Sequence, residues 1–363
     1  MIRIGSVYSG PLPVSLSDSQ KTAYTRLRPV IDTFTAPIDW AAAYGSGVIH
    51  QANATLGPPP LTDFLLATPS PDVFHTTNLR QNPSHYPWYA RIMGGRILGW
   101  LQETWGAGVW YVTMVEIHDI EVKYGIISTK RLRKDLEEWD TLYVGGRLHK
   151  PVLPLKTSAS LDPYLSSNLR SALYLSLLLL SPSHPFSELA LWEQIAGISY
   201  SGDPRMSVPG AENPEKVKNI VRGQGGLDGF RRLYEGAMNS MPGLRWQDES
   251  KDRVGDWAWR GQGEELLVQP DDAKHFATLL ASLPLTLRQN IARHFPPTVT
   301  SALVDKHVGS GRASEPRVRQ GLEFWQRIVD EERFREVVQN GQSENSSNAL
   351  ETRNSRIWRL KVW

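Results

Sequence analysis

Short apolar runs alternate with longer, helix-like segments between about residues 26 and 157, and this alternation limits the fold more than any other feature. Runs of strand length occur at 38–44, 61–67, 108–116, 120–129 and 151–156. Helical patterns lie between them at 89–104 and 130–142, and the two strands before the second helix meet at His118 and Asp119. Such an order predicts an α/β or α+β domain built on one sheet.

The pattern changes after about residue 160, where mostly helical segments follow. Asp162 and Pro163 are typical of a helix start, and the apolar run 172–180 is too short to span a membrane. We expect five regions: an N-terminal extension (1–25), the α+β domain (26–160), a smaller, mainly helical domain for which a winged helix is one arrangement (161–293), a helical segment (294–338), and a polar spacer with a basic-aromatic tail (339–363).

Composition excludes several kinds of chemistry. The chain has no cysteine, so thiol nucleophiles, cysteine zinc sites and disulfides are ruled out. Forty basic and 38 acidic residues leave a net charge of +2, which argues against nucleic acid as the main partner. Thirteen tryptophans fit either a large core or contact with a bilayer surface. The first thirty residues are poor in acids and rich in serine, as in an organellar leader, but Pro11 and Pro13 interrupt any helix there.

A glycine turn and an aspartate suggest phosphate chemistry. Gly45, Ser46 and Gly47 follow the first predicted strand, and glycine turns let backbone N–H groups approach phosphate oxygens. Asp63 lies on the next strand, where its carboxylate can hold a Mg²⁺ ion that bridges the same phosphates. The alternatives are an ordinary turn and a surface aspartate.

Together these parts resemble the nucleotidyltransferase fold, in which a Gly-Ser turn precedes a metal-binding aspartate. That superfamily usually carries a second acid two residues later, where this chain has Leu65; Asp72 is the nearest other carboxylate. Longer strings make the resemblance specific, and they occur in order at 44–48, 63–64, 75–86, 106–109, 123–129, 142–152, 195–206 and 216–221. The set resembles the mitochondrial CTP:phosphatidate cytidylyltransferase family, also called the mitochondrial translocator assembly and maintenance protein family.

The resemblance implies a reaction and a location. CTP and phosphatidic acid would give CDP-diacylglycerol and pyrophosphate, with Mg²⁺ as cofactor, and the product would serve cardiolipin synthesis. The enzyme would sit peripherally on the matrix side of the mitochondrial inner membrane, in contact with anionic lipid and without nucleic acid. Two alternatives stay open: a non-catalytic assembly factor that keeps the fold, and a nucleotidyltransferase acting on a different phosphate acceptor.

The resemblance also assigns roles. Tyr44, Gly45, Ser46 and Gly47 would cradle the triphosphate, Asp63 would bind Mg²⁺ with or without Asp72, and Asp63, Lys123 and Ser46 would be catalytic. Lys123 would neutralise phosphate charge; the alternative is an ion pair with Glu121 on the same strand face. The other predicted ligand-binding residues have core or solvent roles as their alternatives, and they are Asn78, Asn82, His85, Tyr86, Arg147 and Lys150. In the tail, Arg356, Arg359 and Lys361 alternate with Trp358, Leu360 and Trp363, a pattern suited to anionic lipid.

Overall fold

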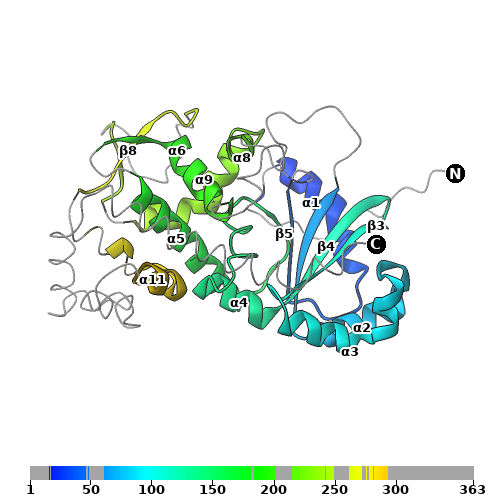
Figure 1. Ribbon diagram of the computed structural model, residues 1–363. Helices are drawn as coiled ribbons and strands as arrows, with labels where there is room; N and C mark the ends of the chain where they lie inside the picture. The colour runs from blue at the N-terminus through cyan, green and yellow to red at the C-terminus, as the bar shows by residue number, and fades with distance from the viewer. Residues whose placement is uncertain are drawn as a thin grey trace. The chain divides into compact units, whose positions relative to one another are not determined.

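The computed structural model describes most of the chain up to residue 292, in the ranges 16, 18–45, 48, 61–180, 184–200, 215–241, 243–248, 261–271, 275, 278–280 and 282–292. These residues form two compact units (Figure 1). The sheet unit holds the described residues up to Arg133 together with Pro151–Asp162, and the helical unit holds Lys134–Lys150 and the described residues from Pro163 onward. The sequence had placed residues 134–150 in the first domain. The basic-aromatic tail lies outside the described residues.

The sheet unit is built on five strands in the order β3-β4-β2-β1-β5. Their bounds are β1 Trp40–Tyr44, β2 Thr62–Thr68, β3 Val109–Ile117, β4 Ile120–Ser128 and β5 Leu153–Lys156. Strands β2 and β4 are parallel and the other neighbours are antiparallel, so the sheet is mixed. The predicted strands and the α+β nucleotidyltransferase-like fold are therefore confirmed.

The β3–β4 hairpin has two local features that set its register. His118 and Asp119 form its two-residue turn, with φ of 53° and 60°, as a tight turn between twisted strands requires. A bulge between Val112 and Val115 then shifts the pairing by one residue, and Met114 within it has a φ of 58°. The bulge brings Tyr111 opposite Gly125.

Helices cover one face of this sheet. Helices α1 Asp18–Asp32 and α2 Pro71–Gln81 supply this cover. The unit also holds α3 Trp88–Thr104, the first part of α4 Thr129–Glu138 and a short 3-10 helix, η1, at Pro83–His85. Phe64 and Tyr124 point from β2 and β4 into a core that includes Leu27 of α1 and Phe74 of α2. Helix α3 packs on α2 (Figure 1). The predicted helix 130–142 ends earlier, at Glu138, because Trp139 and Leu142 adopt positive φ.

The described part of the helical unit is mainly helical, as predicted. Its elements are α5 Asp162–Leu179, α6 Glu188–Gly197, η2 Ile198–Tyr200, α8 Lys216–Val221, α9 Gly226–Asn239 and α11 Leu285–Ala292, with three short strands, β6 Phe186–Ser187, β7 Arg245–Trp246 and β8 Leu266–Val268. The strands form an antiparallel sheet in the order β6-β8-β7. Helix α5 buries the leucine-rich run in the core of this unit. No helix within the described ranges has both the length and the hydropathy needed to span a membrane.

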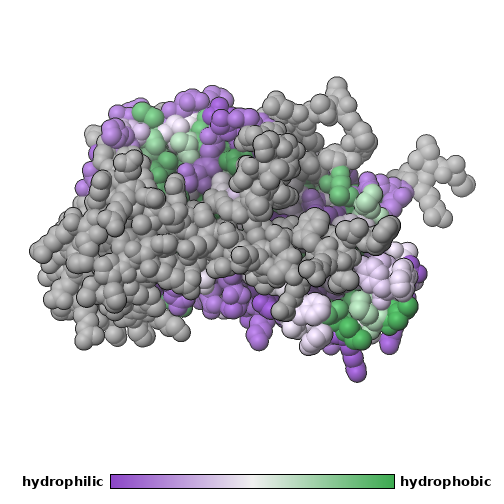
Figure 2. All heavy atoms as spheres, viewed as in Figure 1, coloured by the Kyte–Doolittle hydropathy of each residue, from purple (hydrophilic) through white to green (hydrophobic). Residues whose placement is uncertain are grey.

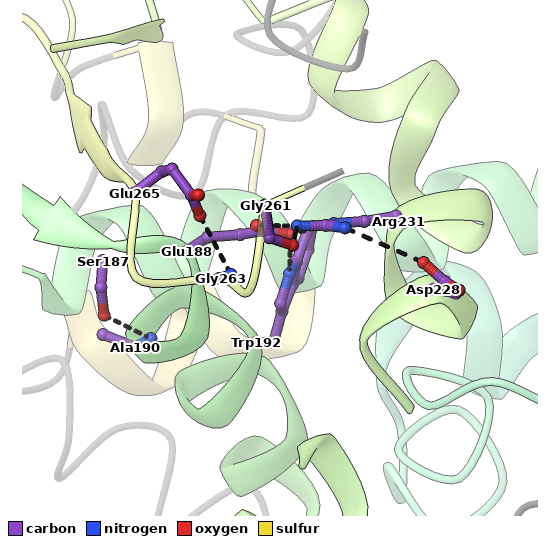
Figure 3. Close-up of polar contacts among 9 residues, drawn as sticks. All are labelled: Ser187, Glu188, Ala190, Trp192, Asp228, Arg231, Gly261, Gly263 and Glu265. Carbon is purple, nitrogen blue, oxygen red and sulfur yellow. Dashed lines mark hydrogen bonds and ion pairs between the residues drawn. The ribbon is translucent and has the colours of Figure 1, made fainter. Parts of the chain in front are cut away.

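A buried ion pair joins α6 to α9 inside the helical unit (Figure 3). Arg231 donates from Nε to Oε1 of Glu188 at 2.8 Å and from Nη2 to Oε2 at 2.7 Å. Trp192 Nε1 donates to Oε1 at 2.8 Å, and Nη2 of Arg231 also donates to the carbonyl oxygen of Gly261 at 2.8 Å. Both charged side chains are almost fully buried. Each charge is thus matched by an aligned partner, which a buried ion pair needs in order to be tolerated.

Candidate active site

Three polar side chains lie in one row across the central strands. The register pairs Tyr44 of β1 with Asp63 of β2, and Asp63 with Lys123 of β4. Directly opposed residues place their side chains on the same face of a sheet. This face is the reverse of the one that carries Phe64 and Tyr124 into the core, because side chains alternate along each strand.

Asp63 and Lys123 are in ion-pair contact and only partly exposed. Lys123 Nζ lies 3.1 Å from Asp63 Oδ1, and the two side chains are 33% and 24% exposed. The contact does not have the alignment of a hydrogen bond, and Asp63 Oδ1 is buried with no hydrogen-bond partner. A carboxylate oxygen in this state has capacity to bind a further positive group. Lys123 therefore pairs with Asp63 and not with Glu121, the partner offered by the alternative interpretation.

Tyr111 of β3 holds Lys123, and its hydroxyl reaches that of Tyr44 on β1. Lys123 Nζ lies 4.9 Å from the centre of the Tyr111 ring, within cation–π range. The Tyr111 hydroxyl is 3.3 Å from that of Tyr44. Gly125 leaves room for the ring, since a Cβ at that position would stand 2.7 Å from Tyr111 Cε1. Tyr111 was not among the residues predicted from the sequence. The one local signal for it was the glycine at position 125, and the bulge in β3 hides which β3 residue lies opposite Gly125.

The glycine turn begins directly beside the aspartate. Gly45 has a φ of +81°, a conformation that glycine adopts without strain. A Cβ there would approach Asp63 Oδ2 to 3.1 Å. Val48 N donates to the Gly45 carbonyl oxygen at 3.1 Å, which closes the turn. Ser46 and Gly47, the other predicted members of the cradle, lie outside the described residues.

The residues present fit a magnesium ion with one protein carboxylate. Mg²⁺ is commonly held by one or two carboxylates, substrate phosphates and water. Asp63 offers an unsatisfied oxygen, and within the described ranges no group of three or more His, Cys, Asp or Glu side chains forms a site made by protein alone. Asp63 is thus suited to a metal that arrives with a phosphate ligand.

Asp72 is not a neighbour of Asp63. Asp63 is at the start of β2, whereas Asp72 lies in the first turn of α2, beyond the other end of the strand. The five residue steps from Asp63 to Thr68 alone span about 16 Å at the usual strand rise. The Ser70 hydroxyl donates to the Asp72 carboxylate and holds its pKa below the usual value. The structure therefore does not support a metal ion shared by these two carboxylates.

Asn78 and Tyr86 belong to a hydrogen-bond network on the opposite face of the sheet. Asn78 Nδ2 donates to the hydroxyls of Tyr86 at 3.1 Å and Tyr124 at 2.9 Å. His75 lies 2.9 Å from the Tyr86 hydroxyl through Nδ1 and 2.8 Å from Gln102 Oε1 through Nε2. Burial lowers the pKa of His75 to about 4 and raises that of Tyr86 to about 12.

The remaining two members of this predicted set join the same network. His85 Nδ1 is 2.8 Å from the Tyr124 hydroxyl, and Asn82 Nδ2 donates to Asn78 Oδ1 at 2.8 Å. Burial lowers the pKa of His85 and raises that of Tyr124. The contacts of these four residues are those of a core network, which was the alternative to ligand binding.

The second predicted phosphate-binding group lies in the helical unit, on a loop shaped by Asp135. Its carboxylate accepts hydrogen bonds from the backbone N–H groups of Thr141, Val144 and Gly145 at 2.8–2.9 Å. Gly145 and Gly146 follow, and a Cβ at Gly146 would lie 2.7 Å from the Leu142 carbonyl oxygen. Asp135, which the sequence analysis passed over as part of a charged helix, thereby fixes the loop that carries Arg147 and Lys150.

Arg147 and Lys150 form a basic cluster on this loop together with Lys216 of α8. The Arg147 guanidinium lies 3.9 Å from the centre of the Tyr143 ring, and Lys150 and Lys216 lie 5.1 and 5.7 Å from that of Tyr200. Lys150 Nζ donates to the Gly146 carbonyl oxygen at 3.0 Å. Desolvation, together with the charges of Arg147 and Lys216, lowers the pKa of Lys150 to about 7. Three cations in one cluster, one of them held partly neutral, are suited to an anion.

Comparison with known proteins supplies the family. The family model described as "Phosphatidate cytidylyltransferase, mitochondrial" matches residues 27–350. Proteins of that name from Schizosaccharomyces pombe and Danio rerio are 41% identical over 225 residues and 38% identical over 270 residues. These matches cover 62% and 73% of this chain, and 56% and 74% of the relatives. The human protein of the same name is 34% identical over 280 residues, 76% of this chain and 57% of its own length.

The chain thus spans little more than half of the Schizosaccharomyces pombe and human relatives, and about three quarters of the zebrafish one. The family model nevertheless covers both the glycine turn with Asp63 and Lys123 and the basic cluster of the helical unit. This chain belongs to the mitochondrial phosphatidate cytidylyltransferase family.

Proposed function

We propose that the protein transfers CMP from CTP to phosphatidic acid, giving CDP-diacylglycerol and pyrophosphate. Family membership supports the reaction, and one structural observation carries the assignment of its site. Asp63 keeps an unsatisfied carboxylate oxygen beside Lys123 and directly below the left-handed glycine turn at Gly45. A carboxylate and a cation next to a glycine turn are the groups that nucleotidyl transfer requires to position phosphates and balance their charge.

The reaction makes and breaks one bond at the same phosphorus atom. An oxygen of the phosphatidic acid phosphate attacks the α-phosphorus of CTP, and the bond from that phosphorus to the oxygen it shares with the β-phosphate breaks, so that pyrophosphate leaves with this oxygen. The attacking phosphate is largely ionised near neutral pH, so no general base is needed. The protein's main tasks are to position the two phosphates and to balance their charge.

Asp63 would hold a Mg²⁺ ion, which neutralises triphosphate charge and orients the pyrophosphate leaving group. Lys123 would then place its ammonium on a phosphate oxygen while the Tyr111 ring keeps the side chain extended over the sheet. Gly45 would allow the turn to approach the same phosphates closely. In the helical unit, Arg147, Lys150 and Lys216 would form a separate binding cluster for a phosphate group.

We extend the proposal to a place in the cell. The relatives are named as mitochondrial, and a phospholipid substrate requires contact with a membrane. We propose a peripheral enzyme on the matrix side of the inner membrane, in contact with anionic lipid, whose product serves cardiolipin synthesis. The two tryptophans on the exposed face of α3 are one source of such contact.

The test is pyrophosphate release from CTP and phosphatidic acid in mixed micelles containing Mg²⁺. The wild-type protein should release pyrophosphate only when the lipid is present, and Asp63→Asn should abolish the release. Glu121→Gln is the matched control, because Glu121 is an exposed acid on the same strand and the same face as Lys123. Absence of release from a folded wild-type protein would overturn the proposal in favour of a non-catalytic assembly factor. Release of pyrophosphate only with another phosphate acceptor would replace phosphatidic acid as the proposed substrate.

A further inference from the structure

Helix α3 exposes five large apolar side chains, which we call the α3 face: Trp88, Tyr89, Ile92, Ile97 and Trp100. Trp88 and Ile92 are 71% and 76% exposed, and Trp100 is 59% exposed. The helix is kinked at Gly94, whose φ of 77° and ψ of 163° are not helical. Trp88 and Ile92 lie four residues apart before the kink, and Ile97 and Trp100 lie three apart after it. Val73 of the adjoining α2 is also exposed. Figure 2 shows hydrophobic and near-neutral residues gathered at the lower right of the view, over these two helices.

The α3 face is exposed because the helix turns its smallest residues toward α2. A Cβ at Gly95 would lie 2.2 Å from the Thr76 backbone nitrogen, and one at Gly99 would lie 2.6 Å from the Asp72 Cα. Only glycine permits this approach. A surface helix normally buries its largest apolar residues, so α3 is oriented the opposite way. Several exposed apolar side chains of this size on one short segment of chain mark a binding surface.

The composition of the α3 face favours a lipid surface as its occupant. Tryptophan and tyrosine, which have an apolar ring and a polar edge, are the residues that concentrate at membrane interfaces. Exposed Arg91 and Arg96 lie on the same helix, and the sequence from residue 88 to residue 102 contains no acidic residue. Basic charge combined with interfacial aromatics complements anionic phospholipid headgroups.

We infer that the α3 face docks the protein on an anionic phospholipid bilayer. The inference rests on the proposed function for its biological sense, since an enzyme that acts on phosphatidic acid must reach a membrane. Helix α3 packs on α2, which covers the sheet face carrying Tyr124, whereas Asp63 and Lys123 lie on the other face. Docking through α3 therefore leaves Asp63 and Lys123 untouched, so that variants of the α3 face test membrane binding separately from the reacting groups.

The experiment is co-sedimentation of the 363-residue chain with vesicles of phosphatidylcholine mixed with phosphatidylglycerol, an anionic lipid that is not the substrate. The triple variant Trp88→Ser/Ile92→Ser/Trp100→Ser should bind at least about tenfold more weakly than the wild type. A variant with Met114→Ser and Leu266→Ser is the matched control, because these two residues are also exposed and apolar but lie elsewhere. The control should bind as the wild type does. Arg91→Gln/Arg96→Gln should reduce the preference for vesicles with phosphatidylglycerol over vesicles of phosphatidylcholine alone.

Equal binding of the triple variant and the wild type would overturn the inference. If the wild type were a dimer and the triple variant a monomer that still binds vesicles, the α3 face would instead be assigned to contact with a second copy of the chain. Activity assays with phosphatidic acid distinguish failure of the docking inference from failure of the proposed function. With a short-chain, water-soluble phosphatidic acid the triple variant should turn over like the wild type, whereas with vesicles its apparent KM should rise about tenfold. Wild-type protein that binds vesicles but releases no pyrophosphate from either substrate would refute the function and leave the docking surface standing.

Discussion

The two central ion pairs of the molecule differ in how completely they are satisfied. Glu188 and Arg231 are almost fully buried in the helical unit and make aligned, bidentate hydrogen bonds. Asp63 and Lys123 are partly exposed in the sheet unit, and Asp63 Oδ1 lacks an aligned donor. A fully satisfied pair has no capacity for a ligand, whereas an incompletely satisfied one can exchange its partner for a metal ion or a phosphate. The comparison indicates a structural role for the first pair and supports the proposed catalytic role of the second.

Breaking the buried pair should have the largest effect. Arg231→Met leaves the Glu188 carboxylate buried without its cation, and the free energy of unfolding should fall by about 3–5 kcal/mol. Urea unfolding measures this change. The corresponding variant in the sheet unit, Lys123→Met, should lower the free energy of unfolding by less than about 1 kcal/mol, because that ion pair is partly exposed. Equal losses of stability in the two variants would contradict the comparison.

The network on the core face of the sheet should make stability depend on pH. Burial lowers the pKa of His75 to about 4 in the folded protein, whereas the unfolded chain has the ordinary value of 6.5. Below pH 6.5 the unfolded state takes up a proton that the folded state resists. The free energy of unfolding should therefore fall between pH 6.5 and pH 4, by about 2–3 kcal/mol from this residue. His75→Gln should flatten the slope in urea titrations over this window; an unchanged slope would mean that the buried ring is not held neutral.

Removing the lysine of the exposed pair should affect turnover more than stability. Lys123→Met should lower kcat for pyrophosphate release about a hundredfold, the usual loss when one group that stabilises transition-state charge is removed. Steady-state kinetics with varied CTP separate this loss from weaker binding. Lys134→Met is the control, because Lys134 makes a comparable, partly exposed ion pair with Asp140 in the helical unit. A similar loss of kcat in the Lys134→Met control would contradict a specific role of Lys123 in turnover.

The smallest of these effects is expected at the glycine turn. Gly45→Ala adds a Cβ at a φ of +81° and 3.1 Å from Asp63 Oδ2. The strain should lower kcat/KM about tenfold, since a left-handed conformation costs a non-glycine residue about 1–2 kcal/mol. Gly236→Ala tests the same change in α9, where a Cβ meets no atom within 4 Å, and it should leave activity unchanged.

The sequence predicted the strands and the position of Asp63 because alternation and glycine turns are local signals. The ion-pair partner of Lys123 could not be predicted from local signals. It depends on the parallel pairing of β2 with β4, which places Asp63 beside Lys123. Tyr111 was missed because the bulge at Met114 shifts the register by one residue.

For the residues around Asn78 and Tyr86, the sequence predicted ligand binding, whereas the fold shows a hydrogen-bond network in the core. Amide, imidazole and phenol groups serve equally well in a ligand site and in a satisfied core network, and a sequence does not distinguish the two uses. The fold does, because it puts these residues on the Tyr124 face, where they bond to one another.

We expect the incompletely satisfied pair at Asp63 to bind a nucleotide together with a divalent cation. Thermal unfolding with CTP, with and without Mg²⁺, tests this expectation, because a ligand that binds only the folded state raises the melting temperature. The melting temperature of the wild type should rise only when Mg²⁺ is present, and this rise should be lost in Asp63→Asn but kept in Glu121→Gln. A rise of equal size in Asp63→Asn would contradict this expectation, since the nucleotide and metal would then be held elsewhere.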